Sequence, residues 1–409
     1  MRVVISGMGV ISALGLDQQE FWHSLVNGQS GIGPIPHDVG PNPEMGMNQV
    51  RFKNGAAVRG YDPDSYFPRK ALSFMDRFAQ FSVIAAREAV TMAGIEWNDE
   101  LRESAAIITG SCMGGRFTEE IGYWELFHHG RHRVHPLTIP LGMSNAGASH
   151  ISMEFGLHGP AYTISTACSS SAHAIGNALW MVRSGAAPMA IAGGSEAPLF
   201  LGGLKAWEAM RVVSPDTCRP FSANRSGMIL GEGAAMLVLE PLDRALARGA
   251  KPLAEIVGFG MSADACHVTQ PSAEGAARAI RAALRDGGLA PEQVGYINAH
   301  GTATDVNDRM ETAAIRMVFG DHTADLPVSS TKSAHGHTLG AAGAIEAVAT
   351  VQALCNGMLP PTMNFAEADP ECDLDVVPNH AREAKVDVAL SQSFAFGGLN
   401  AVLAFRAWH

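Results

Sequence analysis

Short apolar runs alternate with segments of helical periodicity along most of the chain. Residues 161–166 form an apolar run that predicts a buried strand, and a helix that ends at Gly185 is predicted after it. Apolar residues at helical spacing indicate this helix: Ala172, Ile175, Leu179 and Val182. In the second half, a strand at 328–332 precedes a helix rich in small residues at 339–357. This alternation predicts an α/β architecture with helix-covered parallel sheets.

The two halves of the chain resemble each other weakly. In each half a strand ends in Thr, and a helix rich in small residues follows it. The turn between them carries a reactive or charged residue and then a Ser, at residues 166–169 in the first half and 331–333 in the second. A basic stretch with small residues, 244–251, lies between them. We therefore expect two related halves, 1–250 and 251–409.

Composition and charge narrow the functional classes. The chain has 409 residues, of which 47% are hydrophobic and 17% charged, as expected for a well-buried globular protein. Its six cysteines form no C-x-x-C pair, which favours free thiols in the cytoplasm. Gly7 and Gly9 interrupt the first apolar segment, so we expect a strand there and neither a signal peptide nor a membrane span. The net charge of −11 argues against nucleic acid as a partner.

Cys168 is the strongest candidate for chemistry, because it lies between a predicted strand and a predicted helix. The free N–H groups and the dipole of a helix N-terminus favour the thiolate, which is the nucleophilic form. A small buried core cysteine is the simpler alternative. Three further candidates each lie at or just past a strand end, namely His300, Lys332 and His337. Because strand ends converge in an open parallel sheet, we expect these four side chains to lie together.

A histidine-rich stretch at 128–135 could suggest a metal site. Its spacing does not match a helical i, i+4 pair with a third ligand, as in metal-dependent hydrolases. We therefore predict no metal site.

Motifs that share the order and spacing of one enzyme family run along nearly the whole chain. They lie at residues 2–9, 166–171, 219–221, 231–234, 298–302, 332–337, 359–362 and 394–398. On these motifs the chain resembles the β-ketoacyl-acyl-carrier-protein synthases of the thiolase superfamily, the elongating condensing enzymes of fatty acid and type II polyketide assembly. The resemblance implies a thiolase-type fold, in which two pseudo-repeated halves form a five-layered αβαβα sandwich.

The resemblance also implies a decarboxylative Claisen condensation. Cys168 would carry the acyl chain, and backbone N–H groups of Cys168 and Phe396 would form the oxyanion hole. His300 and His337 would donate to the malonyl thioester oxygen, and Lys332 would keep both rings neutral. No cofactor is expected, since the substrates would be carried on the phosphopantetheine of an acyl carrier protein.

Supporting residues follow from the same resemblance. Glu311 or Asp308, on a predicted helix at 305–319, would pair with Lys332. Asp264, His267 and Phe396 would belong to two loops that gate the pocket, and Met113 would line the acyl pocket. Relatives usually have Gly where this chain has Ala395, so the movement of this gate could differ.

The partners implied are an acyl carrier protein and a second synthase-like chain. An acidic carrier would need a local basic patch, for which Arg69 with Lys70 and Arg131 with Arg133 are candidates. The assembly would be a homodimer, or a heterodimer with a chain-length-factor-like paralogue.

Other members of the superfamily fit less well. A degradative thiolase would have a second catalytic Cys near its C-terminus, whereas the last cysteine here is Cys372. A chain-length factor lacks the nucleophile, and an initiating synthase would have Cys-His-Asn. The pathway stays open between housekeeping fatty acid elongation and a specialised polyketide, polyene or lipid-tail pathway. Departures from the usual motifs at Ser73, Phe74, Ala395 and Leu399 favour the specialised pathway.

Overall fold

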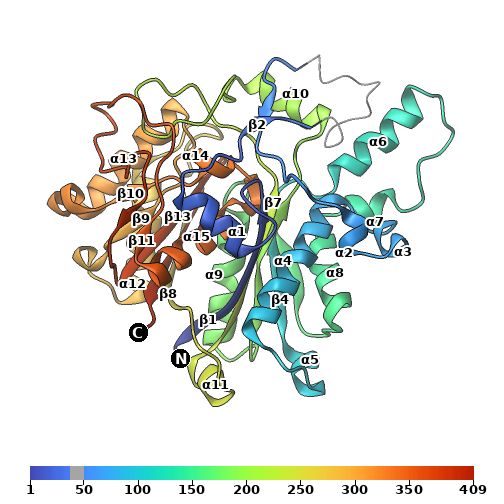
Figure 1. Cartoon of the computed structure of the whole chain (residues 1–409), viewed down its shortest axis with the longest axis horizontal. Helices are drawn as coiled ribbons and strands as arrows, with labels where there is room; N and C mark the ends of the chain where they lie inside the picture. Colours follow the sequence, from blue (N-terminus) through green and yellow to red (C-terminus); the bar gives the residue numbers. More distant parts are fainter. Residues whose placement is uncertain (37–49) are drawn as a thin grey trace.

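The computed structural model describes residues 1–36 and 50–409, and its centre is a mixed sheet of ten strands (Figure 1). In spatial order the strands are β10 (Val328–Ser329), β9 (Tyr296–Asn298), β13 (Val388–Ala395), β14 (Leu399–Ala407), β8 (Ala254–Ala263), β1 (Val3–Ser12), β7 (Gly233–Pro241), β6 (Ala190–Glu196), β4 (Ala106–Gly110) and β5 (Ala161–Ile164).

The sheet consists of two halves with five strands each. Their junction is narrow, since β1 and β8 pair only through Val4 with Glu255 and Ile5 with Ala254. In each half four strands run in the same direction, and the strand second from the junction, β7 or β14, runs the opposite way and pairs antiparallel with both of its neighbours. The expectation of parallel sheets is therefore wrong for β7 and β14, which run against the other strands of their halves, and for the antiparallel pair β1 and β8 at the junction.

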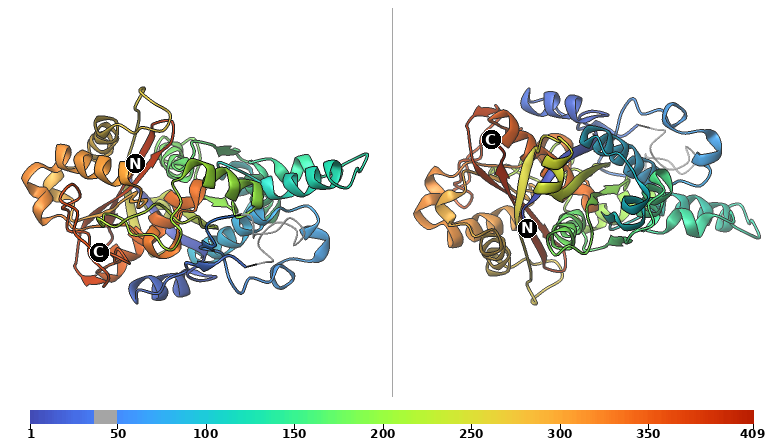
Figure 2. Two further views of the ribbon diagram at one scale, coloured as in Figure 1. Left: turned by 90° about the horizontal axis from the view of Figure 1, so that it is seen from above. Right: turned by 90° about the horizontal axis from the view of Figure 1, so that it is seen from below.

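Helices cover both faces of each half, which gives five layers. The middle layer is α9 (Ser170–Arg183) and α15 (Ala342–Asn356), which contact each other and strands of both halves. One outer layer contains α4 (Arg77–Ala93) and α8 (Ala146–Phe155), and the other contains α12 (Ala273–Gly287) and α13 (Asp305–Phe319) (Figures 1 and 2). The predicted αβαβα fold is confirmed.

Burial on every side explains the composition of α15. Thirteen of its residues are buried, and its small side chains let it pack closely between the two halves of the sheet. The stretch Leu339–Asn356 is apolar enough to cross a membrane by composition, but 89% of it is buried inside the protein, as in a core helix. Its one charged residue, Glu346, is fully buried and therefore needs a partner.

The remaining elements surround this core. They are α1 (Gln18–Val26), β2 (Gly33–Pro34), β3 (Asn54–Gly55), α2 (Pro63–Tyr66), α3 (Arg69–Leu72), α5 (Asp99–Ser104), α6 (Arg116–Phe127), α7 (Thr138–Gly142), α10 (Leu201–Met210), α11 (Leu242–Ala247), η3 (Pro291–Gln293), η4 (Gly320–Asp325), α14 (Lys332–His335), η5 (Leu339–Ala341), β11 (Met358–Leu359) and β12 (Arg382–Glu383). The chain passes from one half to the other through α11, and α6 projects from the body as an arm (Figure 2).

Candidate active site

Cys168 lies in the turn between β5 and α9, as the sequence predicts. Ala167 adopts a left-handed conformation with a φ of 52°, which reverses the chain before the helix. The Ser170 hydroxyl holds the turn, because it accepts a hydrogen bond from the N–H of Thr166 and donates one to the carbonyl of Ala167. Cys168 is buried with 7% of its surface exposed, and it lines a cavity of about 550 Å³.

Burial decides the resting state of the Cys168 thiol. Burial raises its pKa to about 11, and this effect outweighs the nearby charge of Lys332 and the hydrogen bonds from the N–H groups of Phe396 and Cys168, which lower it. The N–H groups thus favour the thiolate, as predicted, but burial outweighs them, and a pKa near 11 favours the neutral thiol near pH 7. The same two N–H groups converge on the sulfur. They would therefore lie beside the carbonyl oxygen of an acyl group that the sulfur attacks, which is the atom that becomes the oxyanion.

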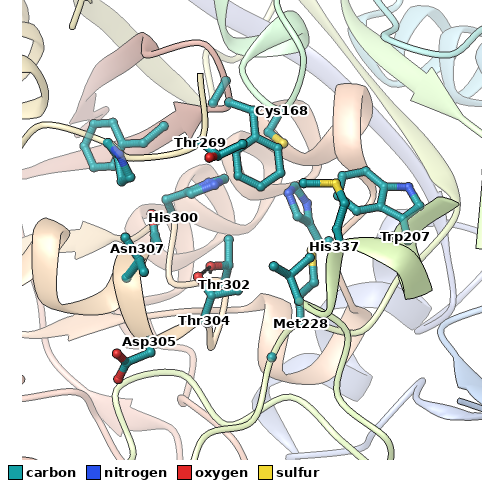
Figure 3. Close-up of a pocket in the computed structure, with 18 of the residues that line it drawn as sticks. Cys168, Trp207, Met228, Thr269, His300, Thr302, Thr304, Asp305, Asn307 and His337 are labelled. Atoms are coloured by element: carbon teal, nitrogen blue, oxygen red, sulfur yellow. Dashed lines mark hydrogen bonds between the residues drawn. The ribbon is translucent and has the colours of Figure 1, made fainter. Parts of the chain in front are cut away.

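Two histidines face Cys168 across the cavity (Figure 3). His300 follows β9 and His337 follows α14, and their rings meet edge to face at 5.4 Å between centroids. The Cys168 sulfur and one nitrogen of each ring all lie within 4.8 Å of one another. The sequence therefore predicted correctly that these residues meet at the strand ends.

Hydrogen bonds on the far side of each ring decide which nitrogen carries its proton. The Nδ1 atom of His337 accepts from the backbone N–H of Leu339 at 3.2 Å, and Nδ1 of His300 lies 3.3 Å from the Nζ of Lys332. Both partners are donors, so Nδ1 is the acceptor in each neutral ring and Nε2 carries the proton. Burial and the charge of Lys332 hold the pKa of both histidines well below the usual value. The site thus presents two neutral N–H donors to one space.

Lys332 has a different carboxylate partner from the one predicted. Its fully buried ammonium forms an ion pair with Glu346 of α15, and neither Glu311 nor Asp308 holds it. Sequence reasoning missed Glu346, although a single charged residue in an apolar helix was an available signal. Burial raises the pKa of Glu346 to about 7, and Lys332 limits that rise.

Glu311 and Asp308 instead hold backbone in place. The Glu311 carboxylate accepts from the N–H groups of His300 and Gly301, both at 2.7 Å, and so fixes the turn that presents His300. Asp308 accepts from the N–H of Phe221 at 2.8 Å. Both side chains are fully buried on α13, and burial raises their pKa values, to about 7 for Glu311 and about 6 for Asp308.

Phe396 stands at the tip of the β13–β14 hairpin and lines the cavity, as expected of a gate. Its ring stacks on Trp207 of α10, with 6.2 Å between centroids. Nothing in the sequence pattern indicated Trp207. Gly397 and Gly398 have φ values of 83° and 70°, and these left-handed conformations suit glycine. Ala395 has no positive φ and belongs to β13.

Asp264 joins the two predicted gating loops. Its carboxylate accepts from the side-chain amide of Asn400 at 2.7 Å and from the N–H of Ser272 at 2.8 Å, and its own N–H donates to the carbonyl of Gly398. A side chain on Gly398 would collide with Asp264, since a Cβ there would lie 2.5 Å from the Asp264 Cβ. His267 is exposed and lines the cavity.

Met113 does not line this cavity. It packs in an apolar cluster that includes Trp207, Met228 and Leu339. A buried carboxylate, Glu196, orders this region because it accepts from the N–H groups of Cys112, Met113 and Gly340. In the described conformation, Met113 therefore packs against apolar side chains and does not face the cavity.

The basic candidates lie on the surface, outside the cavity lining. Arg69 and Lys70 are exposed on α3, and Arg69 lies 3.6 Å from Asp64. Arg131 and Arg133 are exposed beyond α6, where Arg131 pairs with Glu125.

Comparisons with known proteins agree with this geometry. Residues 1–245 match the family described as "Beta-ketoacyl synthase, N-terminal domain", and residues 253–366 match "Beta-ketoacyl synthase, C-terminal domain". The chain is 48% identical over 407 residues to "Nodulation protein E" of Rhizobium meliloti, which covers 99% of each chain. It is 41% identical over 415 residues to "3-oxoacyl-[acyl-carrier-protein] synthase 2" of Synechocystis sp., covering 100% of this chain and 98% of the relative.

A solved structure also matches the whole chain. The ishigamide ketosynthase/chain length factor superimposes with a TM-score of 0.93 at 37% sequence identity, covering 100% of this chain and 99% of the other. The chain therefore belongs to the beta-ketoacyl synthase family of the thiolase superfamily, and it is an acyltransferase that catalyses beta-ketoacyl-acyl-carrier-protein condensation.

Proposed function

We propose that this synthase elongates carrier-bound acyl chains for a specialised product rather than for housekeeping fatty acids. The observation that supports this most is the higher identity to Nodulation protein E, 48%, than to the synthase 2 of Synechocystis, 41%, each over the whole chain. The departures at Ser73, Phe74, Ala395 and Leu399 support it further. Housekeeping elongation is the alternative.

The first step is transfer of the acyl group to Cys168. The sulfur attacks the thioester carbonyl of the acyl carrier, and the oxyanion forms beside the N–H groups of Cys168 and Phe396. As the intermediate collapses, the carbon–sulfur bond to the carrier breaks, and the proton of the Cys168 thiol ends on the released carrier thiol. Because Cys168 begins as a thiol, this exchange needs no net proton uptake.

The second step is condensation. Malonyl carrier loses carbon dioxide, and its thioester oxygen becomes an enolate between the Nε2–H groups of His300 and His337. The enolate carbon attacks the acyl thioester on Cys168, and the Cys168 thiolate leaves and takes up a proton. Neutral donors suit this task, because their protons stay in place while the charge develops. Each such donor contributes roughly two to three powers of ten in rate.

We further propose that the chain works as a dimer through the side of β5. This strand is the last of the sheet and is exposed at Ala161 and Tyr162, so its backbone is free to pair with another strand. Large apolar side chains are exposed on the neighbouring elements: Ile121, Tyr123, Phe127, Ile139, Met143 and Met153. The partner that binds this side of the sheet would be a second copy of this chain or a chain-length-factor-like paralogue.

The substrates would arrive on a cytoplasmic acyl carrier protein. Arg69 with Lys70, and Arg131 with Arg133, remain the proposed contacts for its acidic surface. Glu substitution of one pair should raise the KM for the carrier and leave kcat unchanged if that pair docks it.

A substrate series tests the pathway. The purified protein is incubated with malonyl carrier and acyl carriers of increasing length and unsaturation, and the products are measured by mass spectrometry. Elongation only of acyl chains that are unsaturated or that carry an oxidised β-carbon supports the specialised role. Efficient elongation of saturated chains, together with rescue of a bacterium that lacks its own elongating synthase, would establish the housekeeping alternative.

A further inference from the structure

The catalytic cluster has the ligand set of a zinc site. One sulfur and two imidazole nitrogens lie within 4.8 Å of one another, and all three residues are buried. Cysteine and histidine are the ligands that Zn²⁺ prefers, and three protein ligands with an open position are typical of catalytic zinc. A thiol beside two imidazoles in a cavity lining would therefore be expected to capture Zn²⁺, and a captured ion would block acylation of Cys168.

The hydrogen bonds behind the histidines oppose metal binding. A histidine that binds a metal through Nε2 normally donates its Nδ1–H to a carboxylate or carbonyl. Here both Nδ1 atoms face donors, the N–H of Leu339 at 3.2 Å and the ammonium of Lys332 at 3.3 Å. Each Nε2 therefore carries a hydrogen where a metal would need a lone pair. In addition, the positive charge of Lys332 lies next to the His300 ring.

We propose that Lys332 and the Leu339 N–H keep the Cys168–His300–His337 cluster free of divalent metal ions, and that removal of Lys332 creates a zinc site there. Lys332 bridges His300 to the Glu346 carboxylate. Without the ammonium, His300 is free to move its proton to Nδ1, with Glu346 behind it as the acceptor, directly or through a water molecule. Nε2 of His300 and the sulfur of Cys168 then become available to Zn²⁺ as two protein ligands, while His337 keeps its Nε2 proton because the Leu339 N–H still donates to its Nδ1. The same donors that prepare the rings for the enolate thus exclude metals.

The test compares zinc binding that depends on Cys168. Wild type, Lys332→Met and Lys332→Met/Glu346→Gln are each prepared with and without Cys168→Ala. Zinc retained after dialysis against ZnCl₂ is measured by elemental analysis, and affinity by competition with a chromophoric chelator. Co²⁺ serves as a spectroscopic probe, because thiolate ligation gives a charge-transfer band.

We expect no Cys168-dependent zinc in wild type and a clear Cys168-dependent site in Lys332→Met. Any Cys168-dependent zinc binding that the chelator competition detects in wild type should be weaker than that of Lys332→Met by about 10- to 100-fold, the range that outer-shell partners exert on metal sites. Lys332→Met/Glu346→Gln should bind more weakly than Lys332→Met, because Gln is a poorer acceptor behind His300. Circular dichroism and the elution volume establish that each variant is folded.

Two results would overturn the proposal. Cys168-dependent zinc in wild type, at an affinity equal to that of Lys332→Met, would mean that the donors exclude nothing. A folded Lys332→Met without Cys168-dependent zinc would mean that the ligand spacing, and not Lys332, prevents binding. Tight Cys168-dependent zinc in wild type would by itself overturn the exclusion of metal, even if the Lys332 variants do not fold.

Discussion

The buried pair of Lys332 and Glu346 makes a prediction about stability and its pH dependence. Both side chains are fully buried, and Lys332 limits the rise in the pKa of Glu346, which burial brings to about 7. In Lys332→Met that limit is lost, so the pKa of Glu346 in the folded variant should exceed 7. Lys332→Met/Glu346→Gln lacks the carboxyl group and is the matched control.

The sign of the effect follows from the proton count. Between pH 4.5, the ordinary pKa of a glutamate, and pH 7, Glu346 in Lys332→Met holds its proton when folded and releases it on unfolding. The unfolded state therefore binds fewer protons, and stability falls as the pH rises. Full linkage of one proton is worth about 1.4 kcal/mol per pH unit. Between pH 5 and pH 7, Lys332→Met should thus lose roughly 2–3 kcal/mol relative to the double variant.

Urea unfolding of both variants at pH 5, 6 and 7 measures this difference. All other titrating groups are shared, so their contributions cancel in the comparison. Full linkage predicts that the difference in unfolding free energy between the two variants changes by several times about 0.5 kcal/mol from pH 5 to pH 7. A change smaller than about 0.5 kcal/mol over this range would refute the reasoning. Such a result would mean that Glu346 reaches solvent or another cation when Lys332 is absent.

Three further predictions concern catalysis. Cys168→Ala should fold but show no acylation by mass spectrometry, and acylation of another residue would contradict this. In wild type, the rate at which iodoacetamide alkylates Cys168 should increase about tenfold per pH unit from pH 7 to 10, because the pKa of the thiol lies near 11, and a rate that does not change with pH would contradict this. His300→Ala and His337→Ala should each lower malonyl decarboxylation by roughly two to three powers of ten but lower Cys168 acylation much less, and equal losses would reverse the assigned roles. Ala395 has no positive φ in the described conformation, so any effect of Ala395→Gly must come from other conformations of the hairpin that Gly reaches more easily. On that basis Ala395→Gly should broaden the accepted acyl lengths in a series of acyl-carrier substrates, and unchanged rates would make this departure neutral.

Local patterns in the sequence predicted the α/β class and the meeting of Cys168, His300, Lys332 and His337, whereas the thiolase-type fold and the condensation were implied by the resemblance to a known family. The turns at Cys168 and Lys332 and the strand that ends at His300 are set by short-range periodicity, and the convergence of strand ends is a general property of α/β sheets. The direction of strands beside the junction was less accessible, because antiparallel pairing of β1 with β7 and β8 depends on partners that are far away in sequence. Periodicity alone does not specify those partners.

The parts of the site that sequence reasoning missed are long-range contacts. Glu346 approaches Lys332 only after α15 packs between the two sheet halves, and Trp207 meets Phe396 only when α10 packs beside the hairpin. The effect of burial on Cys168 was missed for a related reason. A helix N-terminus is visible in the sequence, but the depth of burial, which dominates the pKa of this thiol, is a property of the assembled fold.

These corrections change how the mechanism is understood. A resting thiolate is exposed to oxidants and metals at all times, whereas a buried thiol with a pKa near 11 reacts more slowly near pH 7, because little of it is ionised. The two histidines are held as donors by groups that also donate, so they are prepared for a negative charge that appears only after decarboxylation. Reactivity in this site therefore depends on the substrate, which supplies the electrophile and then the anion, while the protein keeps its nucleophile neutral and its hydrogen-bond donors fixed.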